Sequence, residues 1–63
     1  MTTIINRVKY TYTFTPAFGP KILSHVNIGG GVWVNDTETN LAAPLESFEE
    51  FERIAKEIDD IYN

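Results

Sequence analysis

The chain has 63 residues, a formal net charge of −4 and no cysteine, and 43% of its residues are hydrophobic and 13% aromatic. The missing cysteines exclude disulfides and thiolate metal sites, and the apolar content excludes a disordered acidic chain. We therefore expect residues 1–63 to form one small globular domain. Because a core of this size gives little net stability, we also expect a further stabilising contact, a homodimer.

Signals for membrane insertion and secretion are missing from the sequence. No uninterrupted apolar run approaches the length of a membrane-spanning helix, and the first residues lack the basic and apolar regions of a secretory signal. We expect a cytoplasmic protein that makes no contact with a membrane.

Charge is divided unevenly along the chain. Residues 1–35 carry three basic residues and no acid, whereas residues 36–63 carry all nine acids against Arg53 and Lys56. The formal charges of the two parts are therefore +3 and −7. Such asymmetry bears on partners and on electrostatic steering, so it favours a basic partner for the second part. The alternative is that the acids only solvate the surface of a helix.

Residues Ile4–Thr15 alternate between two kinds of side chain with a period of two. This alternation predicts one half-buried β-strand whose even positions form the buried face. The even positions are Ile4, Asn6, Val8, Tyr10, Tyr12 and Phe14. Pro16, Gly19 and Pro20 then interrupt the pattern, which predicts a hairpin connection.

The alternation resumes over Lys21–Ile28 and predicts a second strand, with Ile22 and Val26 on the buried face. The three glycines Gly29–Gly31 permit a tight reversal into a short third strand, Val32–Val34. The polar residues Asn35–Asn40 then predict a turn. A fourth, edge strand at Leu41–Ala43 is left open, so the sheet has three or four strands.

The last segment carries a strong helical signal. Ser47 and Glu50 have the spacing of a capping box, and apolar residues recur at helical spacing from Phe48 to Ile61. We predict an amphipathic helix from Ser47 to Ile61 that packs on the buried face of the sheet. Its charged residues are expected to face solvent: Glu49, Glu50, Glu52, Arg53, Lys56, Glu57, Asp59 and Asp60.

Together these elements predict an α+β fold, an antiparallel meander of three or four strands with one C-terminal amphipathic helix packed on one face. The opposite face of the sheet stays open. Inward-facing Val32 and Val34 would place Trp33 on this open face. Because a short strand that is apolar on both sides indicates an interface, we expect self-association through Leu23, His25 and Trp33.

No combination of residues predicts a catalytic, cofactor or metal site. Ser24 and His25 are neighbours on a strand, so their side chains point to opposite faces and cannot act as nucleophile and base. The polar residues from Asp36 onward have the spacing that opens a calcium loop, but the glycine and the bidentate glutamate of such a loop are missing. We therefore expect a protein that is not an enzyme.

The sequence favours a small non-enzymatic protein-interaction module, an inhibitor or modulator that meets a basic surface on another protein. The expected binding surface is the charged helix face: Glu49, Glu52, Arg53, Lys56, Glu57 and Asp60. The alternative is single-stranded nucleic-acid binding by the open sheet face, with Arg7, Lys9 and Lys21 as the charges and His25 and Trp33 as stacking platforms. This alternative is weaker, because three basic residues are few and the acidic helix repels phosphate.

Overall fold

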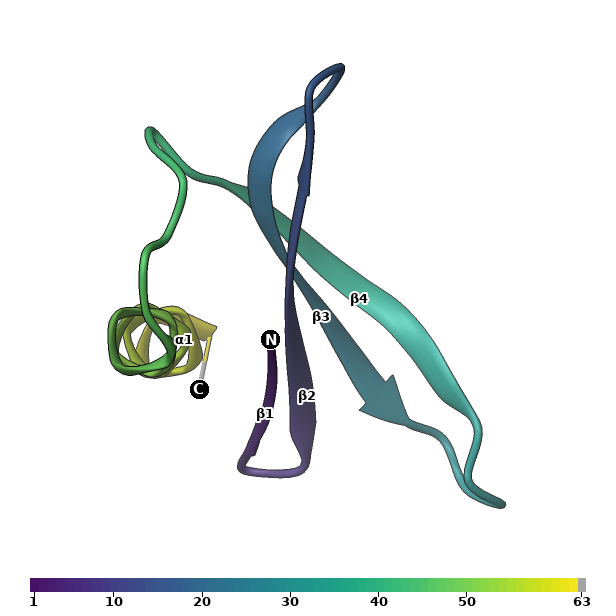
Figure 1. Ribbon diagram of the computed structural model, residues 1–63. Helices are drawn as coiled ribbons and strands as arrows, with labels where there is room; N and C mark the ends of the chain where they lie inside the picture. The colour runs from purple at the N-terminus through teal and green to yellow at the C-terminus, as the bar shows by residue number, and fades with distance from the viewer. Residues whose placement is uncertain (63) are drawn as a thin grey trace.

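The computed structural model describes residues 1–62, which form one sheet and one helix. The elements are β1 (Thr2–Ile5), β2 (Val8–Thr15), β3 (Gly19–Asn27), β4 (Trp33–Asn40) and α1 (Phe48–Tyr62). The strands pair antiparallel in the order β1-β2-β3-β4, and α1 packs against one face of the sheet (Figure 1). The predicted α+β fold is confirmed: the sheet is a four-stranded meander, and the single helix follows it.

The single strand predicted over Ile4–Thr15 is wrong, because the chain reverses within it. Asn6 and Arg7 have φ angles of 50° and 67°, and they join β1 to β2 as a two-residue turn. Two successive left-handed residues are what a type I′ hairpin turn requires. The reversal places Ile5 opposite Val8 and turns Ile4 to the open face opposite Lys9, so Ile4 is 60% exposed instead of buried.

The predicted third strand is present but longer than expected, since Trp33 and Val34 begin β4, and the turn predicted after it is wrong. Residues Asn35–Asn40 belong to β4, and Leu41–Ala43 form no strand. Polar residues suit this position because β4 is an edge strand whose outer side has no neighbour. On the side facing α1, Thr37 and Thr39 lie opposite Ser24 and Ile22 of β3. The second half of β4 therefore alternates threonines with longer polar residues.

The core lies between α1 and the two central strands. Phe51, Ala55 and Ile58 of α1 are buried against Tyr10 of β2 and Ile22 of β3. Partly buried hydrophobic residues surround this cluster: Ile5, Val8, Tyr12, Leu41, Leu45 and Ile54. The predicted buried face is therefore largely correct.

Phe14 is the exception on that face. It pairs with Pro20 near the end of the β2–β3 hairpin and is 51% exposed. Figure 1 shows that this end of the hairpin projects away from α1. The helix therefore does not bury every residue on the face of the sheet that it packs against.

The start of α1 follows the predicted cap. The Glu50 amide donates to the Ser47 side-chain oxygen at 3.1 Å, which satisfies one of the amides left free in the first helical turn. The linker before it is held by Tyr12, whose hydroxyl accepts the Leu45 amide at 3.2 Å. This contact fixes where the chain crosses from the sheet to the helix.

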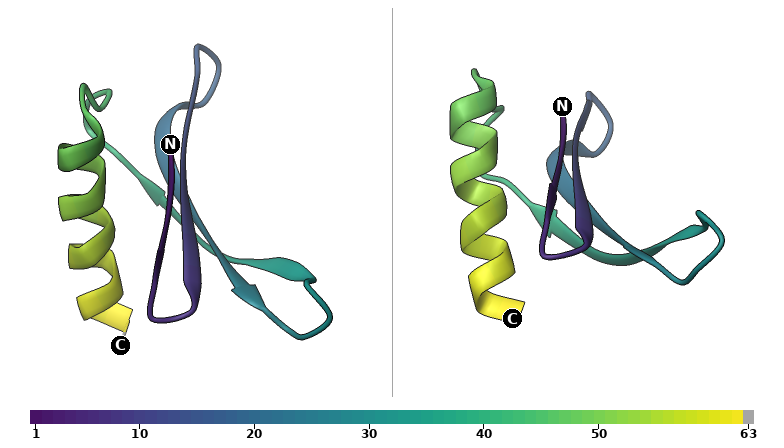
Figure 2. Two further views of the ribbon diagram at one scale, coloured as in Figure 1. Left: turned by 60° about the horizontal axis from the view of Figure 1, so that its bottom comes forward. Right: turned by 90° about the horizontal axis from the view of Figure 1, so that it is seen from below.

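The helix covers only part of the sheet. Figures 1 and 2 show α1 beside β1 and β2, whereas the tip of the β3–β4 hairpin projects away from it. The tip consists of Gly29, Gly30 and Gly31, with φ angles of 109°, 61° and 75°. Three successive left-handed residues strongly favour glycine, which explains the glycine run without a phosphate-binding role.

The turn at Asn6 and Arg7 makes a testable prediction. Because an L-residue other than glycine or asparagine is strained in the left-handed region, Arg7→Gly should raise the free energy of unfolding by about 1 kcal/mol. Arg7→Ala keeps the strain and should leave stability nearly unchanged. Urea denaturation followed by circular dichroism measures both. A loss of stability in Arg7→Gly, as glycine causes inside a strand, would contradict the turn.

Candidate functional site

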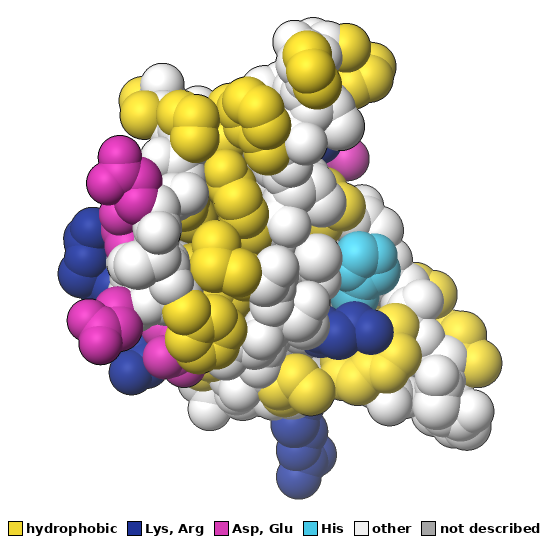
Figure 3. Space-filling model, viewed as in Figure 1, with side chains coloured by type: hydrophobic (Ala, Val, Ile, Leu, Met, Phe, Trp, Pro, Cys, Tyr) yellow, Lys and Arg dark blue, Asp and Glu magenta, His cyan; other side chains and the backbone are white. Residues whose placement is uncertain are grey.

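The charged helix face is mixed rather than uniformly acidic. Of the six residues predicted to bind a partner, five are exposed and Glu52 is half-buried. Four of the six are acidic and two are basic, and the Arg53 guanidinium contacts the Glu57 carboxylate at 3.2 Å. Figure 3 shows acidic and basic side chains alternating along the outer edge of the helix. The structure therefore gathers these residues on one surface whose net charge is small.

The open face of the sheet holds the residues predicted for self-association. Leu23, His25 and Trp33 are each half-buried, and the Lys9 ammonium lies 4.6 Å from the centre of the Trp33 ring. This cation–π contact covers part of the ring with a charged side chain. The His25 Nδ1 atom is buried and has no hydrogen-bond partner among residues 1–62. Side chains of the sheet itself therefore cover part of its open face.

Asp59 does not face solvent as predicted, since it is only 3% exposed. Its carboxylate accepts a hydrogen bond from the Tyr10 hydroxyl at 2.9 Å and one from the Asn6 side-chain amide at 2.6 Å. A buried carboxylate needs such donors, because leaving it without them costs several kcal/mol. The helical spacing grouped Asp59 with the exposed acids, because the two residues that donate these hydrogen bonds lie far earlier in the chain, in β2 and in the β1–β2 turn.

Tyr10 is the partner of Asp59 that lies deepest in the core. Burial raises the pKa of Tyr10 well above its ordinary value of 10.0, and the hydrogen bond to Asp59 and the negative charges of Asp59 and Asp36 raise it further. The phenol is therefore protonated at neutral pH and acts as a donor. It ties α1 to the sheet and offers no proton for acid or base chemistry near neutral pH.

An apolar surface remains uncovered on the β3–β4 hairpin, on the side of the sheet that faces α1. Val26 lies opposite Val34, and the Ile28 amide donates to the Val32 carbonyl at 3.0 Å, which makes Ile28 and Val32 the next pair toward the tip. We call these four residues the hairpin ledge. Val26 is half-buried, but Val34, Val32 and Ile28 are 38%, 51% and 66% exposed. The ledge is thus a row of four branched aliphatic side chains, three of which stay exposed within residues 1–62.

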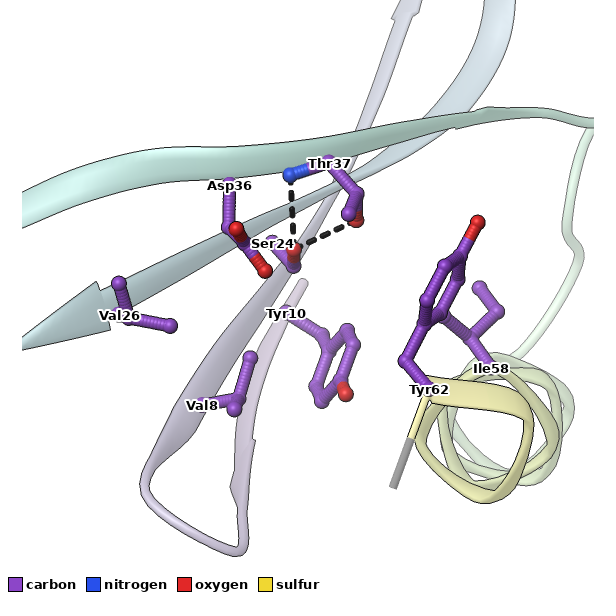
Figure 4. Close-up of a pocket in the computed structure, with 8 residues that line it drawn as sticks. All are labelled: Val8, Tyr10, Ser24, Val26, Asp36, Thr37, Ile58 and Tyr62. Carbon is purple, nitrogen blue, oxygen red and sulfur yellow. Dashed lines mark hydrogen bonds between the residues drawn. The ribbon is translucent and has the colours of Figure 1, made fainter.

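A pocket of about 110 Å³ adjoins the ledge, and Val26 belongs to both. Figure 4 shows the pocket between the sheet and the last turn of α1. Its walls combine apolar and polar side chains, and none of the lining residues is basic. The lining residues are Val8, Tyr10, Ser24, Val26, Asp36, Thr37, Ile58 and Tyr62.

A β-bulge places an acid in this pocket. Thr37 pairs with Ser24 and Asn35 with His25, so Asp36 is an extra residue in β4. The Thr37 amide donates to the Ser24 side-chain oxygen at 3.0 Å, and the two hydroxyls share a hydrogen bond of 2.6 Å. A bulge redirects side chains, and here both Asp36 and Thr37 line the pocket (Figure 4). The sequence gives no signal for this bulge.

The chemistry available at these surfaces is limited. Ser24 bonds with Thr37 on the side facing α1, and His25 pairs with Asn35 across the sheet on the open face, so the two side chains do not meet. Within residues 1–62 no three acidic or histidine side chains are grouped as metal ligands would be. The 15 residues of α1 are too few and too charged to cross a bilayer, and residues 1–62 contain no longer helix.

Comparisons with models of protein families, with curated proteins and with solved structures find no match to this chain.

The burial of Asp59 makes a prediction for which its neighbour Asp60 is a matched control. Asp59→Asn removes the charge that strengthens both hydrogen bonds, so it should lower the free energy of unfolding by about 1 to 3 kcal/mol. Asp60 is exposed, and Asp60→Asn should change stability by less than about 0.5 kcal/mol. Urea denaturation at pH 7 compares the two. Equal effects would show that the Asp59 bonds contribute little.

Proposed function

We propose that this chain is a small non-enzymatic protein-interaction module, an inhibitor or modulator of another protein. The observation that carries the proposal is the hairpin ledge, a row of four aliphatic residues of which three are exposed in a chain of 63 residues. Contiguous exposed apolar patches on small monomers are typical of binding surfaces, because exposure of apolar side chains to water is unfavourable. Burying them against a partner would supply the stability that a small core lacks.

Charge supports a basic partner for this surface. Residues of β4 and α1 line the pocket beside the ledge, and all nine acids lie in residues 36–63, which include most of β4 and all of α1. The charged helix face, Glu49, Glu52, Arg53, Lys56, Glu57 and Asp60, adds a small excess of negative charge beside them. We propose that these acids steer a basic protein toward the ledge, since exposed charges act mainly on association rates.

Self-association is proposed for the opposite, open face. Leu23, His25 and Trp33 supply half-buried surface there that a second copy would cover. A copy is a poorer candidate for the ledge, because it would bring its own acids toward those of β4 and α1. The two faces therefore suit different partners.

Single-stranded nucleic-acid binding by the open face is the weaker proposal. Lys21 lies 3.8 Å from the Glu38 carboxylate, and Lys9 covers part of the Trp33 ring. Both contacts reduce what the face offers to phosphates and bases, which need free cations and free aromatic surfaces.

The proposal predicts that a photo-crosslinking residue at position 28 captures a protein in cells of the native host. The double substitution of Ile28 and Val32 by serine should weaken capture of the same protein by an affinity-tagged chain at least about tenfold, because each serine removes an apolar contact worth about 1 kcal/mol or more. The double variant should keep the circular dichroism spectrum of the unaltered chain, since both residues are exposed.

Phe18→Ser is the matched control, because Phe18 is also an exposed hydrophobic residue but lies on the β2–β3 turn, away from the ledge. It should leave capture unchanged. Crosslinks to nucleic acid alone, or equal capture by the double variant and the unaltered chain, would refute a protein-binding ledge.

A further inference from the structure

The pocket beside the ledge has room for a side chain. A buried water needs about 10 to 15 Å³, so the pocket volume of about 110 Å³ exceeds the space of a single water several-fold. Val8, Val26 and Ile58 supply apolar walls that would contact the carbon atoms of an inserted side chain. The pocket opens beside the ledge, so a segment bound on the ledge can direct one residue into it.

Three of the five polar side chains that line the pocket are already bonded to the protein. The Ser24 and Thr37 hydroxyls bond to each other, and the Tyr10 hydroxyl donates to Asp59. Of the other two, Tyr62 is 65% exposed and uncharged at neutral pH, and Asp36 carries a charge. No hydrogen bond or ion pair joins the Asp36 carboxylate to another group within residues 1–62. The pocket therefore presents a negative charge to whatever enters it.

The charge around the pocket is negative as a whole. Asp59 lies behind Tyr10, and both Asp59 and Asp36 act on the Tyr10 phenol, whose pKa they help to raise. No basic side chain lines the pocket to offset them. A ligand with a positive charge is favoured here, and one with a negative charge is repelled.

We infer that the pocket receives a lysine or arginine side chain from the protein that binds the hairpin ledge, with its aliphatic stem against Val8, Val26 and Ile58 and its cation at Asp36. Lysine and arginine commonly bury their stems on apolar surface while the charged end stays at a polar rim. The partner is thus a segment in which a basic residue stands between apolar residues. The inference rests on the proposed function and specifies the chemistry of the partner.

A second copy of this chain is a poorer occupant. The basic residue that a copy could offer from a turn is Arg7, which is exposed between β1 and β2. Arg7 follows the polar residue Asn6, so it does not stand between two apolar residues. A copy also carries a net charge of −4, which opposes its approach to an acidic pocket.

The test is a titration of the isotope-labelled chain with two peptides, followed by nuclear magnetic resonance. The peptides are acetyl-Val-Arg-Val-amide and its norleucine counterpart, which keeps an aliphatic stem but has no charge. The arginine peptide should shift the amide signals of Ser24, Thr37 and Ile58 and bind at least fivefold more tightly than the norleucine peptide. Asp36→Asn should weaken the arginine peptide at least fivefold, and Glu46→Gln, which removes an exposed charge in the linker before α1, less than twofold.

Three results would overturn the inference. If the two peptides bind the ledge equally well, the pocket does not recognise the positive charge, and the proposed function still stands. Absence of any shift at the pocket would remove the pocket as a site, and the crosslinking at position 28 would then test the ledge by itself. Pocket signals that move with the concentration of the chain alone, and stop moving in Asp36→Asn, would identify a second copy as the occupant.

Discussion

The position of the helix depends on one buried carboxylate. Asp59, near the end of α1, accepts hydrogen bonds from Tyr10 in β2 and from Asn6 in the β1–β2 turn. These bonds require the end of the helix to lie over the first hairpin, because a buried carboxylate moved away from its donors would lose several kcal/mol. A helix of 15 residues held there cannot also cover the far end of the β3–β4 hairpin. The uncovered ledge is thus a consequence of how Asp59 is satisfied.

The ledge and the pocket arise from the same strand pair. Gly29–Gly31 let β3 and β4 extend as a projecting hairpin, and the bulge at Asp36 turns an acid toward α1 where regular pairing would alternate it away. Apolar surface and a free carboxylate therefore lie next to each other between the hairpin and the helix. This combination suits an amphipathic, basic segment of another protein better than a lipid surface, a phosphate or a small metal ion.

Local chemistry made part of this structure predictable. Ser47 marks the helix start because its oxygen serves as the cap, and the even face of the central strands follows from their alternation. The turn at Asn6 and Arg7 was not predicted because arginine replaces the glycine usual in such turns, and only the start of β4 was predicted because its later residues are those of a polar loop. Asp59 and the pocket were not predictable at all: the donor Tyr10 lies 49 residues earlier in the chain, and the bulge needs the Ser24 partner across the sheet. Within the candidate site, the sequence identified the acids but not which of them would be buried, paired or free.

The central claim is that α1 packs on the first hairpin and leaves the ledge uncovered. Nuclear Overhauser effects of the free chain in dilute solution test it most directly. The account predicts contacts from the Ile58 methyl groups to the Tyr10 ring, together with no contact from any residue of α1 to the Ile28 or Val32 methyl groups. Contacts between α1 and Ile28 or Val32 would contradict it, because the helix would then cover the surface proposed for the partner. Absence of contacts between Ile58 and Tyr10 would also contradict it, because the helix would then not pack on the first hairpin.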